Sequence, residues 1–106
     1  MKRLQLLGLA TVALCVAAGA HAEGDKAHGR ELVYTCAGCH GVDGYQNVYP
    51  SYNVPHIAGQ NEQYIINALH EYKTGERKHP TMGAQAQSMS DKEIEDIAAY
   101  LSSLAK

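Results

Sequence analysis

Near the C-terminal end of the chain, apolar residues recur with the period of an α-helix. One face of this segment carries the stripe Ile94, Ile97, Ala98, Leu101 and Leu104. The residues before the stripe match a capping box, with Ser90 at the N-cap and Glu93 at N3. Met89 and Ile94 flank this box and can form a hydrophobic staple. These positions predict an amphipathic helix that begins at Ser90 and buries its apolar face.

Two further helices are predicted earlier in the chain, and polar segments separate them. The middle helix has an apolar face with helical spacing, formed by Tyr64, Ile65, Ala68, Leu69 and Tyr72. Gly75 can cap its C-terminal end. A shorter helix is predicted over residues 26–34, with Asp25 as its N-cap. Residues 41–59 and 75–87 have no sustained period and are predicted as long loops, the first of which needs something to wrap around in so small a domain.

The N-terminal segment has the layout of a secretory signal peptide. Lys2 and Arg3 precede an uncharged apolar run from Leu4 to Ala20, and Ala20-His21-Ala22 matches a signal-peptidase site. A retained membrane anchor is the alternative, but this run is short for a bilayer span. We therefore expect a cleaved leader over residues 1–22, a single exported domain over residues 23–106, a periplasmic location and no stable membrane insertion after cleavage.

Removal of the leader changes both the charge and the cysteine content. Residues 23–106 keep seven Lys and Arg against eleven Asp and Glu, which gives 7 − 11 = −4 and argues against a nucleic-acid partner. Cys15 leaves with the leader, so Cys36 and Cys39 are the cysteines that remain. The chain also has no Trp and no Phe. A domain with so few large apolar side chains would gain stability from another large apolar body in its core.

The sequence Thr35-Cys36-Ala37-Gly38-Cys39-His40-Gly41 allows three chemistries. A structural zinc site needs four ligands, and the chain has no second cysteine pair or spaced histidine pair to complete one. A thioredoxin-type dithiol requires a preceding strand, which the flanking residues do not indicate. Two cysteines two residues apart and followed at once by histidine match c-type haem attachment, with His40 on the iron. This third interpretation is the prediction, with one covalently attached haem c.

A second iron ligand must come from elsewhere if both faces of the haem are filled. Met82 lies in a segment predicted to be a loop, where no apolar stripe explains it, whereas Met89 is explained by the hydrophobic staple. Met82 is therefore the predicted ligand, in keeping with known Met/His ligation. The other candidates are the remaining histidines, and His79 is the first to test because it is near Met82: His28, His56, His70 and His79.

The chain resembles the class I cytochromes c, in particular the small bacterial monohaem type that is similar to one half of a dihaem cytochrome. Three blocks carry the resemblance in order: GDKAHGRELVYTCAGCHG, PHIAGQNEQYIINALHEYKTGERKHPTM and MSDKEIEDIAAYLSSL. It implies an all-α cytochrome c-like fold, with three main helices and long loops wrapped around one covalently bound haem. The segment VYPSYNV, with Tyr49 and Tyr52, looks longer than usual for the family.

The resemblance also implies roles for particular residues. The first and last helices would cross near Gly29 and the segment Ala98-Ala99-Tyr100. The carbonyl of Pro55 would accept the Nδ1 proton of His40, which fixes the imidazole and increases its basicity. Arg77 would approach a haem propionate, although an ordinary solvated cation is an equally good interpretation of this residue.

These observations predict a one-electron carrier that cycles between Fe(II) and Fe(III) and is not an enzyme. Its partners would be donor and acceptor redox proteins with basic patches, met in weak encounters that bury little area, and the chain itself would be a monomer or weak oligomer. Two alternatives stay open. One is a haem subunit of a larger dehydrogenase or oxidase, and the other is an enzyme or gas sensor with open iron.

Overall fold

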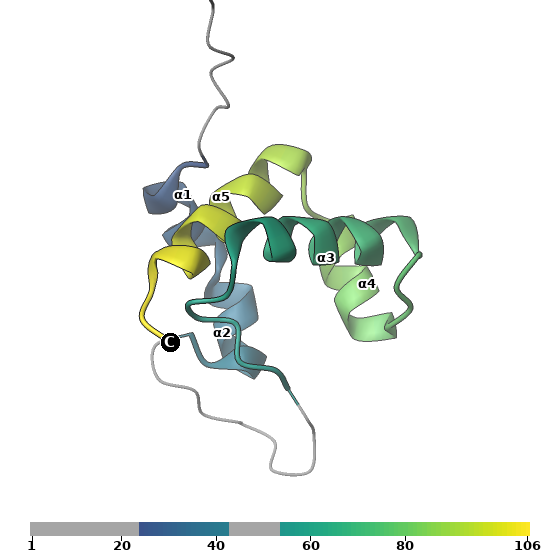
Figure 1. Cartoon of the computed structure of the whole chain (residues 1–106). Coiled ribbons are helices and arrows are strands. Elements are labelled where there is room, and N and C mark those ends of the chain that lie inside the picture. The colour runs from purple at the N-terminus through teal and green to yellow at the C-terminus, as the bar shows by residue number, and fades with distance from the viewer. Residues whose placement is uncertain (1–23, 43–53) are drawn as a thin grey trace, which may run out of the picture.

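Five helices and no strand make up the part of the chain that the structure describes. The computed structural model describes residues 24–42 and 54–106 (Figure 1). In chain order the helices are α1 Lys26–Leu32, α2 Tyr34–His40, α3 Glu62–Thr74, α4 Pro80–Gln87 and α5 Asp91–Ser103. The predicted all-α class is confirmed, while the predicted leader and the tyrosine-rich segment around Tyr49 and Tyr52 lie outside the described residues. Within those ranges, no helix is both long and apolar enough to cross a bilayer.

The three predicted helices correspond to α1, α3 and α5, and their ends are capped as the sequence indicates. The side chain of Asp25 accepts a hydrogen bond from the His28 N–H at the start of α1. Ser90 and Glu93 form the reciprocal capping box of α5. Gly75 ends α3 in the left-handed conformation, with φ of 84°, which glycine adopts without steric cost.

Helices α2 and α4 are not among the three predicted helices. A single residue, Val33, separates α2 from α1. It keeps an αR backbone, and its carbonyl accepts from the N–H groups of Cys36 and Ala37 in α2. Helix α4 occupies part of the predicted loop 75–87, and that part of the prediction is wrong. Pro80 stands in the first helical turn, where its missing N–H has no intrahelical partner to lose, and the His79 side chain caps the helix by accepting from the Met82 N–H.

Helices α1 and α5 cross with almost no space between them at Gly29. A Cβ atom at this position would lie 2.0 Å from the backbone oxygen of Asp96 and 3.0 Å from Cβ of Tyr100. Glycine therefore allows the two backbones to approach more closely than any other residue would. The crossing runs along Asp96 to Tyr100, which agrees with the contact that the family resemblance implies.

Helix α5 supplies more of the core than any other helix. Ile94, Ile97 and Leu101 are at most 2% exposed. The same cluster includes residues from the other helices and connections: Val33, Val42, Ile65, Leu69 and Met89. Helix α1 contacts α2, and α3 contacts α4 (Figure 1). The helix with the cysteines and His40 and the helix with Met82 are thus held by different neighbours.

Candidate functional site

Helix α2 presents the two cysteines and His40 from one short stretch of helix. Cys36 is half-buried, Cys39 is exposed, and neither is in a disulfide. Burial raises the pKa of the Cys36 thiol, with only partial opposition from its contact with Thr35. A redox-active dithiol has the opposite property, because its nucleophilic cysteine needs a lowered pKa. Cys36 therefore lacks the property expected of the nucleophile in thiol exchange.

The imidazole of His40 is held in one tautomer. Its side chain is buried, with the residue 9% exposed, and Nδ1 lies 2.8 Å from the carbonyl oxygen of Pro55. A carbonyl can only accept a hydrogen bond, so Nδ1 carries a proton and, in the neutral ring, Nε2 holds the lone pair. The contact that the family resemblance implies is present, and it leaves Nε2 as the atom that can bind a metal.

A zinc centre has no support in the part of the chain that the structure describes. No group of three or more His, Cys, Asp or Glu side chains there is arranged to hold a metal ion. A structural zinc site requires four such ligands close together. The same residues form no strand, so the flanks of α2 also lack the strand-to-helix context of a thioredoxin-type motif.

Met82 lies in α4 and not in the predicted loop, so the sequence argument for it as an iron ligand is weaker. It is half-buried and packs against the hydrophobic core, so apolar contacts account for part of its burial. Met89 is only 8% exposed and belongs to the core itself, directly before the capping box of α5. Of the two sulfur atoms, that of Met82 belongs to the less buried side chain. Its ligation of iron stays a prediction.

Two of the other candidate residues near α4 already have protein partners. Nδ1 of His79 accepts from the backbone N–H of Met82 at 3.2 Å, so this nitrogen caps the helix. Nη1 of Arg77 lies 3.4 Å from the Tyr64 hydroxyl, and its guanidinium carbon lies 4.8 Å from the Tyr72 ring centroid. Arg77 is thus oriented by two aromatic residues of α3, and its approach to a propionate stays a prediction.

The remaining predicted histidines lie elsewhere in the fold. Nδ1 of His28 is 2.7 Å from a carboxylate oxygen of Asp96, and Nδ1 of His70 is 3.8 Å from Asp91. The sequence did not indicate the first pair, because Asp96 lies away from the apolar stripe of α5 and looks like a solvated position. Its one sequence signal is Lys92, four residues earlier on the same helix. His56 is exposed in the segment that leads to α3.

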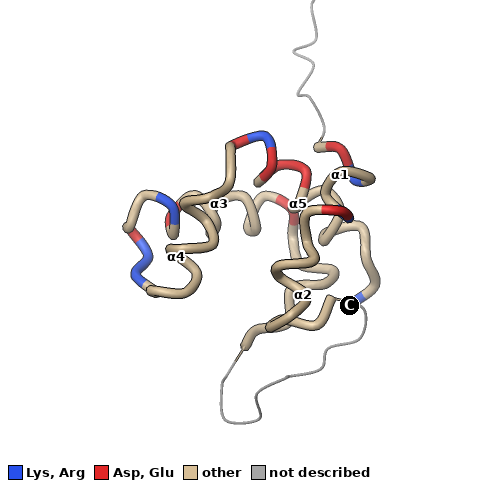
Figure 2. Tube along the Cα trace, turned by 180° about the vertical axis from the view of Figure 1, so that it is seen from behind, with Lys and Arg blue, Asp and Glu red and all other residues tan. Residues whose placement is uncertain are grey.

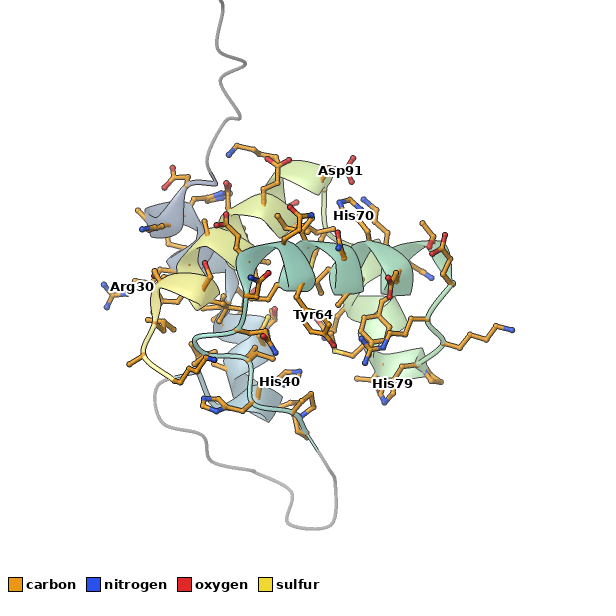
Figure 3. The ribbon with its side chains drawn as sticks, in the orientation of Figure 1. Arg30, His40, Tyr64, His70, His79 and Asp91 are labelled. Atoms are coloured by element: carbon orange, nitrogen blue, oxygen red, sulfur yellow. The ribbon has the colours of Figure 1, made fainter. Side chains whose placement is uncertain are left out.

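The residues around His40 fit a large, flat, apolar group. No charged residue lies in α2, and Figure 2 shows this helix free of acidic and basic positions while charges gather on the other helices and connections. Tyr64 of α3 is 51% exposed and lies on the side of α3 toward α2 and α4 (Figure 3). Two thiols for covalent links and an imidazole whose Nδ1 is held by Pro55 form a donor set that suits haem c, and the exposed Tyr64 ring adds apolar surface on this side of α3.

Comparisons with known proteins agree with this assignment. The family described as Cytochrome c matches residues 26–105. A cytochrome c-554(548) from Halomonas halodenitrificans is 42% identical over 83 residues, which cover 76% of this chain and 96% of that protein. A cytochrome c4 from Pseudomonas aeruginosa is 40% identical over 84 residues, covering 79% of this chain but only 40% of the relative. The chain thus spans less than half the length of that cytochrome c4.

A relative with a different kind of name also matches. The cytochrome subunit of sulfide dehydrogenase from Chlorobaculum tepidum is 38% identical over 81 residues, which cover 76% of this chain and 70% of that protein. The names of the relatives thus include both cytochromes and a cytochrome subunit of an enzyme.

Proposed function

This chain belongs to the cytochrome c family, whose members carry covalently bound haem c and transfer electrons, and from that premise we propose that it is an exported one-electron carrier. Cys36 and Cys39 would form the thioether links to the haem. His40 and Met82 would be the ligands that hold the iron. Arg77 would approach a propionate.

The observation that carries the proposal is the hydrogen bond between His40 and Pro55. The 2.8 Å contact keeps the proton on Nδ1 and directs Nε2 away from the Pro55 carbonyl. Because the histidine directly follows Cys39 on the same helix, a group attached to the two sulfur atoms would lie within reach of its ring. Donation to the carbonyl also increases the basicity of the ligand.

The bound haem supplies the Fe(II)/Fe(III) couple, and the residues of the chain determine how it is used. The Met82 thioether is a neutral, soft ligand that favours Fe(II) and so raises the reduction potential. If His40 and Met82 both hold the iron, no coordination position would be open to oxygen or peroxide. The chain would then carry electrons without making or breaking bonds in a substrate.

The absorption spectrum of the purified haem-loaded protein tests this proposal. We expect the weak charge-transfer band at the red end of the visible spectrum that reports methionine sulfur on ferric haem iron. We also expect the ferrous protein not to bind carbon monoxide at neutral pH. Absence of the band together with rapid carbon monoxide binding would instead support open iron, as in a haem enzyme or gas sensor.

The apolar leader predicted over residues 1–22 supports export, and periplasmic donor and acceptor redox proteins would be the partners.

One observation favours a second function, as a haem subunit of a larger dehydrogenase, because a relative bears the name of a sulfide dehydrogenase cytochrome subunit. Size-exclusion chromatography of the native complex distinguishes the two. A single peak at the mass of a monomer or weak oligomer supports the free carrier, whereas a co-eluting catalytic subunit supports the second function.

A further inference from the structure

The carbonyl that accepts the His40 proton belongs to a segment with no helix of its own. Pro55 is exposed, and residues 54–57 have no regular secondary structure. A turn at Ala58 and Gly59 then leads toward α3. The position of the Pro55 carbonyl therefore depends on how this turn is fixed to the rest of the domain.

Gly59 joins the turn to the last turn of α5. Its N–H donates to the carbonyl oxygen of Leu101 at 2.8 Å. The same oxygen accepts from the Leu104 N–H at 3.2 Å, and its second lone pair receives the Gly59 N–H because no N–H four residues ahead bonds to it. The Leu101 residue is 2% exposed and packs in the core. The turn is thereby anchored to the most buried helix of the domain.

The atoms around Gly59 leave no room for a side chain at this position. The backbone has φ of +74°, in the left-handed region that other residues rarely adopt. A Cβ atom at this position would lie 2.7 Å from Cγ of Lys106, 2.9 Å from the Lys106 backbone nitrogen and 3.0 Å from the Leu104 carbonyl oxygen. The C-terminal tail thus covers the turn, and any substitution of Gly59 must move one of them.

We propose that Gly59 is a positioning residue for the iron ligand His40, acting through the Pro55 carbonyl. This inference rests on the proposed role of His40 as the haem ligand. A firm hydrogen bond from Nδ1 makes the imidazole more basic, and a more basic ligand favours Fe(III). If the turn moves away from α5, the bond between His40 and Pro55 weakens and the reduction potential rises.

The test compares Gly59→Ala with Gly75→Ala in the haem-loaded protein. Gly75 has φ of +84° and no atom within 4 Å of its hypothetical Cβ, so its substitution imposes similar backbone strain without steric conflict and at the far end of α3. We expect Gly59→Ala to shift the reduction potential upward and to speed hydrogen exchange of the His40 Nδ1 proton, measured by NMR in the ferrous state. Gly75→Ala should lower stability and leave both of these quantities unchanged.

Two further variants keep the proposal falsifiable. Gly59→Asn adds a Cβ but tolerates the left-handed backbone, so it should fold even if Gly59→Ala does not, and shift the potential in the same direction. Lys106→Ala in the Gly59→Ala background removes the Cγ contact and should restore part of the original potential. Equal potentials and exchange rates in the Gly59 variants and Gly75→Ala would overturn the proposal. Failure of His40 to bind the iron would appear separately, in the spectrum of the unchanged protein.

Discussion

The carboxylate of Asp96 holds the imidazole of His28 across the point where α1 and α5 cross. Oδ2 of Asp96 lies 2.7 Å from Nδ1 of His28. Its other oxygen accepts from the Lys92 ammonium at 2.6 Å and from the Asp25 backbone N–H at 2.7 Å. Asp96 is 1% exposed, so this buried carboxylate is compensated by three donors, two of them from the N-terminal segment. It fastens the N-terminal helix to the core.

Replacement of Asp96 by alanine should therefore lower stability. The change removes three hydrogen bonds to a charged acceptor, and we expect a loss of roughly 2 kcal/mol in the free energy of unfolding. Urea denaturation of the haem-loaded protein measures it. Glu95→Ala, one residue earlier and partly exposed, is the control and should have little effect. A loss of similar size in both variants would mean that substitution in α5 is destabilising in itself and that the hydrogen bonds of the Asp96 carboxylate are not the cause.

The same pair predicts that stability falls as pH rises above 6.5. The hydrogen bond to Asp96 raises the pKa of His28 above its ordinary value of 6.5, with smaller contributions from Asp25 and Glu31. The folded chain thus holds this proton more tightly than the unfolded chain. The stabilisation is complete below pH 6.5 and is lost as pH passes through the raised pKa. His28→Gln should flatten the pH dependence of the urea midpoint in this range, and an unchanged slope would contradict the assignment.

The Asp96 carboxylate should stay ionised, and keep its three hydrogen bonds, at pH values below the ordinary pKa of 3.8. Burial opposes ionisation of Asp96, but the hydrogen bonds from His28, Lys92 and the Asp25 backbone outweigh it and lower the pKa to about 2. Because the folded pKa is below the ordinary value of 3.8, this contribution is present above pH 3.8 and is lost as pH falls toward 2. NMR titration of the Asp96 carboxyl carbon measures it directly, and a midpoint near 3.8 would show that the three donors do not stabilise the charge.

Two of the helical glycines, Gly29 and Gly38, should respond to alanine in opposite ways. At Gly29 the added methyl group would collide with the Asp96 backbone oxygen, 2.0 Å away, and separate α1 from α5. We expect a loss of about 3 kcal/mol or more in unfolding free energy. Gly38 has no atom within 4 Å of a hypothetical Cβ. Alanine there should stabilise α2 by roughly 0.5–1 kcal/mol. Equal effects at both sites, in urea denaturation, would contradict the close crossing.

The helices that the sequence predicted are those that carry their own local signals. The capping box at Ser90 and the glycine at position 75 act within a few residues, so they can be read without knowledge of the fold. Helix α4 was missed because histidine is an uncommon N-cap and Pro80 resembles a helix breaker. The break between α1 and α2 at Val33 depends on backbone geometry, and no residue type in the sequence indicates it.

The candidate site shows the same division between local and long-range information. Cys36, Cys39 and His40 are adjacent in the chain, so their shared chemistry is visible in the sequence. The partner of His40 is fifteen residues away in the chain, and only a family resemblance suggested Pro55. The anchoring of that carbonyl by Gly59 and Leu101 joins segments far apart in the chain, and no pattern in the sequence specifies it.

Alanine variants of Met82 and Met89 should show which methionine ligates the iron and which one packs in the core. Met82→Ala removes the predicted sulfur ligand, so the charge-transfer band should disappear and the reduction potential should fall, because the soft thioether no longer favours Fe(II). Met89 is 8% exposed in the core, so Met89→Ala should lower the unfolding free energy by about 2–5 kcal/mol while the spectrum stays unchanged. Spectroscopy, potentiometry and urea denaturation of both variants give the comparison. If Met89→Ala abolishes the band and Met82→Ala preserves it, the ligand is Met89, and the core contacts of Met82 account for its position in α4.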